Sequence, residues 1–228
     1  LRNDVIVSAN GKNSTIKKGE KEFEKVDWVF QDGIGYVFPE PANVNIKNSE
    51  ATGSWWLINK QSDSPKDEVK LDVFKLWIDH GTRPSDKTYE YIVVPATSAE
   101  KLQQNSSKEN ITIISNTPEI QAVKHTDLNM CQVVFYKAGE IQVTDNLKLV
   151  CDNPGIVMLK MKGEKITEIS VADPNRELNK MFLSISSKIE KSGDNFKAIW
   201  NEKNGVSDIL IDLPQTVYAG KSVTIKFD

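Results

Sequence analysis

Short runs of β-branched and aromatic residues recur along the whole chain, and polar or turn-forming residues separate them. Within several runs apolar and polar residues alternate, as in Ile209-Leu210-Ile211-Asp212-Leu213. Alternation with a period of two is typical of a β-strand that buries one face. On this pattern we predict strands at residues 5–7, 26–30, 34–38, 69–78, 89–94, 111–114, 133–136, 147–151, 156–161, 166–171, 182–185, 209–213 and 223–227.

Turn-forming pairs lie between the predicted strands. Asn10-Gly11, Asp32-Gly33 and Asn204-Gly205 suit the positive φ angles of tight hairpins. Many short strands with frequent turns favour an all-β fold of antiparallel β-sandwiches over strands that alternate with helices. The pattern predicts one short helix at residues 98–104, with Ser98 as its N-cap.

The clearest change in composition is the polar stretch at residues 103–110 (QQNSSKEN), which has no residue able to anchor a core. A chain of 228 residues is long enough for one large core or two modest ones. We therefore expect a domain boundary there, with one domain at residues 1–107 and a second at 108–228. Because the start of the chain has neither an initiator methionine nor a signal sequence, we expect it to be part of a longer protein.

Charge and hydropathy exclude two classes of partner. The 29 basic and 32 acidic residues are spread along the chain, so no basic stripe is available for a nucleic-acid backbone. The chain has three arginines, Arg2, Arg83 and Arg176. Arginine has the planar guanidinium group that can donate two parallel hydrogen bonds to a carboxylate or sulfate. No apolar run approaches the roughly 20 residues that cross a bilayer, so we predict no membrane span.

Few residues are available for metal or nucleophilic chemistry. His80 and His125 are the only histidines and have no partner histidine at helical spacing, so we expect structural roles, no metal site and no cofactor. No serine or cysteine lies in a known nucleophile motif. Cys131 and Cys151 are too far apart for a CxxC pair. They either form a disulfide between neighbouring strands or are two buried small hydrophobic residues.

The pair Trp55-Trp56 is a candidate sugar-binding site. Adjacent side chains of a strand point to opposite faces, so a strand here would expose one indole. An exposed aromatic ring can stack on a sugar ring. The alternative is that the indoles fill a core or pack at a domain interface.

Seven stretches, in order along the chain, resemble one enzyme family. They are residues 28–39 (WVFQDGIGYVFP), 53–55 (GSW), 76–84 (LWIDHGTRP), 89–95 (YEYIVVP), 116–125 (NTPEIQAVKH), 134–139 (VFYKAG) and 170–174 (SVADP). They span most of the chain and resemble polysaccharide lyase family 8, which contains chondroitin AC lyases, hyaluronate lyases and xanthan lyases.

The resemblance implies a parent protein with an amino-terminal α/α toroid, a large central β-sandwich and a smaller carboxy-terminal β domain. Residues 1–107 would then be the carboxy-terminal part of the central lyase β-sandwich domain, and residues 108–228 the carboxy-terminal lyase β domain. It also implies cleavage of a uronic-acid glycoside by β-elimination. The family uses an asparagine, a histidine, a tyrosine and an arginine carried mainly by the helical domain. None of their motifs matches here, so we predict no catalytic residue in this chain.

One of the matching stretches suggests a structural role. Gly81 and Pro84 flank a predicted chain reversal after a long strand, where glycine permits an unusual φ and proline stiffens the turn. His80 and Arg83 are then predicted to hydrogen-bond to the neighbouring domain.

Together these observations predict the non-catalytic β-sandwich portion of a secreted or periplasmic polysaccharide lyase that degrades chondroitin sulfate or hyaluronan. Its expected partners are the toroid domain of the same parent protein and the acidic polysaccharide. The parent is expected to be an enzyme, and this portion to be inactive alone. Two other functions stay open: an independent carbohydrate-binding module that uses Trp55 or Trp56, and a structural cell-surface β-sandwich protein.

Overall fold

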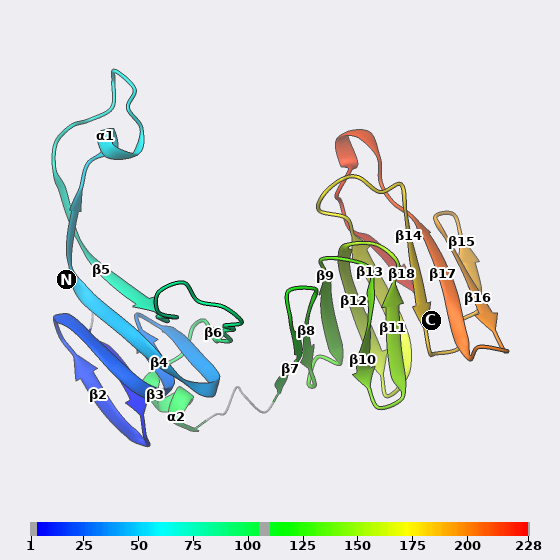
Figure 1. Cartoon of the computed structure of the whole chain (residues 1–228), viewed down its shortest axis with the longest axis horizontal. Helices are drawn as coiled ribbons and strands as arrows, with labels where there is room; N and C mark the ends of the chain where they lie inside the picture. The colour runs from blue at the N-terminus through cyan, green and yellow to red at the C-terminus, as the bar shows by residue number, and fades with distance from the viewer. Residues whose placement is uncertain (1–3, 105–109, 228) are drawn as a thin grey trace. The chain divides into compact units, whose positions relative to one another are not determined.

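The computed structural model describes residues 4–104 and 110–227, and their regular structure is almost entirely β-strand. The chain divides into two compact units, Leu1–Lys108 (unit 1) and Glu109–Asp228 (unit 2), coloured blue to green and green to red in Figure 1. Every strand pair recorded for the described residues is antiparallel, and the strands form three six-stranded sheets. The predicted all-β antiparallel fold is confirmed.

Unit 1 is built on one sheet with the strand order β2-β1-β3-β4-β5, and β6 pairs with β4 beside this path. Helix α1 lies at the far end of the β4–β5 hairpin, and α2 follows β6 (Figure 1). The bounds are β1 Val5–Ala9, β2 Lys12–Ile16, β3 Gly19–Gln31, β4 Ile34–Gly53, α1 Trp55–Ile58, β5 Val69–Trp77, β6 Ile92–Val94 and α2 Ala99–Gln104.

Strand β4 is 20 residues long and contains two prolines. The register of the β3–β4 pair shifts between Val26 and Trp28, and Pro39 and Pro41 lie opposite this shift. Because proline has no N–H to donate, a strand accepts it where the ladder is already interrupted. Beyond the prolines, β4 pairs with β5 as far as Gly53.

Apolar side chains pack on both faces of the unit 1 sheet. Val29 and Phe38 are fully buried in the larger cluster. Trp28 faces the opposite way, as the next residue of a strand must, and packs in a second cluster with Leu102 of α2. The predicted helix at residues 98–104 is confirmed, with the N–H of Lys101 donating to the Ser98 hydroxyl at 3.3 Å.

Unit 2 contains two sheets, with the strand orders β10-β11-β14-β17-β16-β15 and β18-β13-β12-β9-β8-β7. The bounds are β7 Ile111–Asn116, β8 Ile120–His125, β9 Met130–Phe135, β10 Gly139–Thr144, β11 Leu147–Cys151, β12 Gly155–Lys162, β13 Lys165–Ala172, β14 Lys180–Ile185, β15 Lys191–Gly193, β16 Phe196–Asn201, β17 Val206–Asp212, the 3-10 helix η1 Thr216–Tyr218 and β18 Val223–Lys226.

Both sheets of unit 2 contribute to a single core. Leu149 of β11 and Ile209 of β17 come from one sheet and Leu159 of β12 from the other, and all three are fully buried in the same cluster. A core enclosed between two antiparallel sheets is the arrangement of a β-sandwich.

Asp173, the residue after β13, is a buried carboxylate held by backbone donors. Its Oδ1 accepts the N–H of Asn175 at 2.9 Å, and its Oδ2 accepts the N–H groups of Glu177 and Leu178 at 2.7 Å each. Burial, the largest single influence, raises the pKa of this carboxyl, but the surrounding N–H donors together hold the pKa below its ordinary value of 3.8. The ionised side chain therefore fixes the first part of the β13–β14 connection.

We predict that Asp173→Asn destabilises the protein. The amide oxygen can replace only one of the two carboxylate oxygens, so either the N–H of Asn175 or the N–H groups of Glu177 and Leu178 lose their acceptor. The free energy of unfolding at pH 7 should fall by about 2–3 kcal/mol, measured by urea denaturation and circular dichroism. The control is Asp152→Asn, an exposed position, which should change stability by less than about 0.5 kcal/mol.

The pH dependence of this effect has a defined sign. Because the folded-state pKa of Asp173 lies below 3.8, its stabilisation is present above that pH and is lost as the pH falls through the folded-state pKa. The stabilities of wild type and D173N should therefore converge below pH 3.8. A difference that stays constant into strong acid would contradict this account.

Candidate functional site

Unit 1 carries a hollow of about 730 Å³ beside β5. Its lining runs from the fully buried Phe38, through the half-buried Phe74, to the exposed Tyr89 and Tyr91. We call it the aromatic hollow, because aromatic side chains make up most of its lining. It is lined by Tyr36, Phe38, Phe74, Lys75, Leu76, Trp77, Ile78, His80, Tyr89 and Tyr91.

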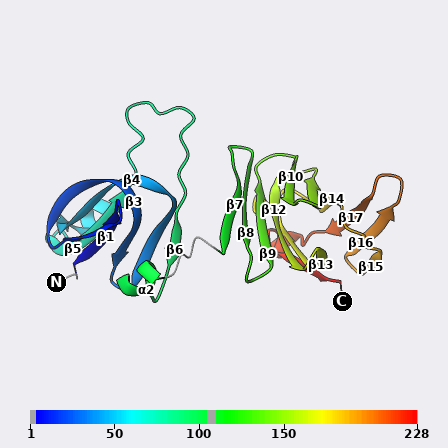
Figure 2. The same cartoon turned by 90° about the horizontal axis from the view of Figure 1, so that it is seen from below.

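The outer rings come from the long β5–β6 connection, residues 78–91, which projects from the sheet in Figure 2. The ring centroids of His80 and Tyr89 are 6.1 Å apart, and those of Tyr89 and Tyr91 are 6.3 Å apart with only 20° between their planes. Deeper in the hollow, Tyr36 and Phe74 are 5.8 Å apart. The hollow therefore offers a series of flat aromatic faces from its base to its opening.

The turn that begins this connection is stabilised locally. The Asp79 Oδ1 accepts the N–H of Gly81 at 2.7 Å, and Gly81 adopts a φ of +77° that favours glycine. His80 lines the aromatic hollow, whereas Arg83 is exposed and is not among the lining residues. The role predicted for His80 and Arg83, hydrogen bonding to a neighbouring domain, stays a prediction.

The expected exposure of one indole of Trp55 and Trp56 assumed a strand, and the structure has a helix there. Strand β4 ends at Gly53, and the tryptophans begin α1, in which the N–H of Asn59 donates to the carbonyl of Trp55 at 2.9 Å. In a helix, adjacent side chains are not on opposite faces. Trp55 is nevertheless 61% exposed, while Trp56 is half-buried with the Lys66 Nζ 4.5 Å from its ring centroid.

A second hollow, of about 300 Å³, lies beside α1. Trp55, Leu57 and Ile58 line it together with Val69 and Leu71 of β5, and all five side chains are exposed. This surface is mainly aliphatic, in contrast to the aromatic hollow.

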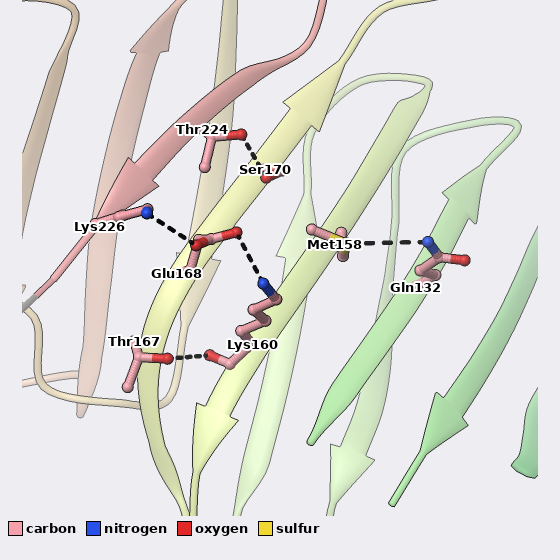
Figure 3. Close-up of polar contacts among 8 residues, drawn as sticks. All are labelled: Gln132, Met158, Lys160, Thr167, Glu168, Ser170, Thr224 and Lys226. Carbon is pink, nitrogen blue, oxygen red and sulfur yellow. Dashed lines mark hydrogen bonds and ion pairs between the residues drawn. The ribbon is translucent and has the colours of Figure 1, made fainter. Parts of the chain in front are cut away.

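The outer face of the β18-β13-β12-β9 part of unit 2 carries a row of polar contacts (Figure 3). Glu168 lies between Lys160 at 3.7 Å and Lys226 at 4.0 Å, and the Ser170 and Thr224 hydroxyls are 2.7 Å apart. Each contact links neighbouring strands in direct register. These side chains satisfy one another across the sheet, so we interpret the row as structural.

Both cysteines are free and buried, in different sheets of unit 2. Of the two readings left open by the sequence, the structure shows the buried thiols. Burial raises the pKa of Cys131 to about 11 and also raises the pKa of Cys151, whose Sγ lies 3.2 Å from the carbonyl of Asn153. Thiols with raised pKa values are poor nucleophiles near neutral pH.

Among the residues that the structure describes, no group of three or more His, Cys, Asp or Glu side chains is arranged to hold a metal ion. In the same residues, no helix has the length and apolar character needed to cross a membrane.

The sequence singled out His80 but did not join it to Tyr89 and Tyr91. The available signal was the Tyr-Glu-Tyr spacing at residues 89–91, because in an extended segment residues two apart lie on the same side. Phe74 and Tyr36 gave no comparable signal, since they lie 38 residues apart on different strands and are not paired with each other in the sheet.

Two models of one family match the chain in order. The "super-sandwich domain" of polysaccharide lyase family 8 matches residues 1–106, and the "C-terminal beta-sandwich domain" of the same family matches residues 112–181. The chain belongs to polysaccharide lyase family 8. The resemblance found in the sequence is confirmed.

The relatives of this polysaccharide lyase family 8 chain are much longer than it is. It is 33% identical to Chondroitinase-AC of Pedobacter heparinus over 98% of its own length, which is 30% of that protein. It is 29% identical to a xanthan lyase of Bacillus sp.. That match covers 76% of the present chain and 19% of the xanthan lyase. The chain therefore spans less than a third of either protein.

Solved structures agree with this family fold. A structure of chondroitinase AC lyase aligns with 99% of the present chain, with a TM-score of 0.78 and 33% identity. The aligned part is 31% of the chondroitinase AC lyase chain. A xanthan lyase of Paenibacillus matches 99% of the chain and 22% of its own, with a TM-score of 0.82. At 23% identity, the second likeness shows the fold alone.

We predict that neither thiol reacts in the folded protein. Because both are buried and their pKa values are raised, a dithiobis-nitrobenzoate reagent should label essentially no cysteine at pH 8 without denaturant. In guanidinium chloride it should label two. Rapid labelling of the folded protein would contradict the burial, and no labelling after denaturation without reductant would indicate a disulfide.

Proposed function

We propose that the chain is the non-catalytic β portion of a lyase that degrades chondroitin sulfate or hyaluronan by β-elimination. Residues 1–107 are the carboxy-terminal part of its central β-sandwich domain, and residues 108–228 are its carboxy-terminal β domain. The observation that carries the proposal is the order of the two family matches, super-sandwich and then C-terminal sandwich, in a chain equal to 30% of Chondroitinase-AC. In this proposal both domains brace an α/α toroid of the same parent protein.

The chemistry of elimination supports this division of labour. A lyase must neutralise the uronate carboxylate, remove the C5 proton with a base and protonate the departing oxygen. The family resemblance implies that the asparagine, histidine, tyrosine and arginine for these steps belong mainly to the helical domain. His80 and Tyr89 are close to each other, but they match the β-domain framework of the family, and we assign them no catalytic role.

The proposal includes the substrate class and the location. The names of the relatives refer to chondroitin, xanthan and hyaluronate, all of them acidic polysaccharides. Polymers of this kind lie outside the bacterial cytoplasm, so the parent protein acts as a secreted or periplasmic enzyme.

We predict that this chain alone forms no elimination product. Incubated with chondroitin sulfate and with hyaluronan, it should give a flat ultraviolet trace at the absorption band of the unsaturated uronate product. Chondroitinase-AC of Pedobacter heparinus, assayed under the same conditions, is the positive control. Steady growth of the band would place a complete elimination site within these residues and overturn the proposal.

The bracing role can be tested in the same relative. Chondroitinase-AC expressed without the segment that aligns with this chain should lose thermal stability and product formation together. Full activity of the shortened relative, at an unchanged melting temperature, would contradict bracing.

A carbohydrate-binding module is the second candidate, because Trp55 is 61% exposed on α1. If this indole stacks on sugar, Trp55→Ala should weaken retention of the chain on immobilised chondroitin sulfate by about tenfold. The matched control is Leu57→Ala, which removes an exposed aliphatic side chain from the same helix. Equal effects of the two substitutions would show that retention does not depend on stacking by the indole, and would contradict this candidate.

A further inference from the structure

The aromatic hollow has the size and lining of a ligand site. Small-molecule sites are typically concave, roughly 300–1,000 Å³ in volume, and lined by apolar and aromatic side chains with a few polar groups. At about 730 Å³, this hollow fits that description. The lining residues that carry polar groups are Lys75, Trp77, His80 and the three tyrosines.

The two outer tyrosines point to a sugar as the ligand. One face of a pyranose ring presents mainly C–H groups, which pack on an aromatic face, while its edge presents hydroxyls. Tyr89 and Tyr91 are 63% and 50% exposed, and their planes are nearly parallel. They form an accessible flat surface with a hydroxyl on each ring.

Charge around the hollow favours an acidic sugar. Lys75 is exposed on β5 and lines the hollow, and His80 lines it from the start of the β5–β6 connection. The nearby acids do not line it: the Asp79 Oδ1 is engaged with the N–H of Gly81, and the half-buried Glu90 is absent from the lining. A uronate carboxylate here would meet cationic and donor groups.

We propose that the aromatic hollow binds a uronic-acid-containing oligosaccharide, with Tyr89 and Tyr91 stacking on the sugar and Lys75 facing its carboxylate. The identity of the sugar rests on the proposed function, since the family acts on acidic polysaccharides. The β portion then has a binding site for the polysaccharide that is separate from the site of elimination. The surface beside α1 is a weaker candidate, because its lining is mainly aliphatic.

The test is calorimetric titration of the full chain with a hyaluronan hexasaccharide. Wild type should bind, and Tyr89→Ala and Tyr91→Ala should each weaken binding by about tenfold, the loss of one stacked ring. Tyr91→Phe, which keeps the ring, should stay within about threefold of wild type. The matched control is Tyr218→Ala in unit 2, where the tyrosine is also 63% exposed, and it should bind as wild type does.

The contribution of charge has a separate readout. Lys75→Gln should weaken binding and reduce its dependence on salt concentration, because one screened charge pair is lost. A neutral cello-oligosaccharide of equal length should bind more weakly than hyaluronan to wild type and about equally to wild type and K75Q.

Two results would overturn the inference: no binding at millimolar hexasaccharide, or equal weakening by Tyr91→Ala and Tyr218→Ala. The first would leave the hollow as a surface for another part of the parent protein. Neither result bears on the elimination assay. Product formation by the chain alone would instead refute the proposed function while leaving binding in the hollow intact.

Discussion

Backbone pairing along β4 is the constraint on which unit 1 depends. This single strand forms ladders with β3, β5 and β6, so the sheet, α1 at its far end and the β5–β6 connection are all positioned by one 20-residue segment. A backbone N–H or C=O group that is buried without a hydrogen-bond partner raises the free energy of the folded state. A long strand is therefore most stable when its ladder of hydrogen bonds is continuous. The register shift opposite Pro39 and Pro41 lets the strand continue where two N–H donors are missing.

The fold was predictable wherever sequence pattern and burial coincide. Residues 147–151 were predicted to the residue as β11, because apolar positions there are buried between the sheets. The predicted strand at residues 34–38 ends before Pro39, whereas β4 continues to Gly53. The prolines are accommodated by the register shift in the pairing with β3, and this shift cannot be predicted from the sequence of β4 alone. Strands β8 and β16 were missed because polar residues interrupt their apolar positions, Gln121 and Lys124 in β8 and Lys197 and Asn201 in β16.

The candidate site was less predictable, because it is assembled by pairing between distant segments. Tyr36 and Phe74 are 38 residues apart on different strands, β4 and β5, and Phe74 pairs with Asn48 instead of Tyr36, so neither strand pattern indicates that their rings meet. Tyr89 and Tyr91 were visible as a spaced pair, but nothing in the sequence placed them beside His80. For Trp55, the expected sugar stacking assumed a strand, whereas β4 ends at Gly53 and helix α1 begins at Trp55.

The burial of both thiols in the unit 2 core has a consequence for the conditions under which this unit can fold. Cys131 and Cys151 contribute as apolar groups, so no covalent cross-link needs to form or be preserved. The native state therefore requires no disulfide-forming oxidoreductase, and a change in redox potential acts on the unfolded chain, in which the thiols are exposed. Once the sandwich is folded, burial shields both thiols from oxidants in a reducing or an oxidising compartment.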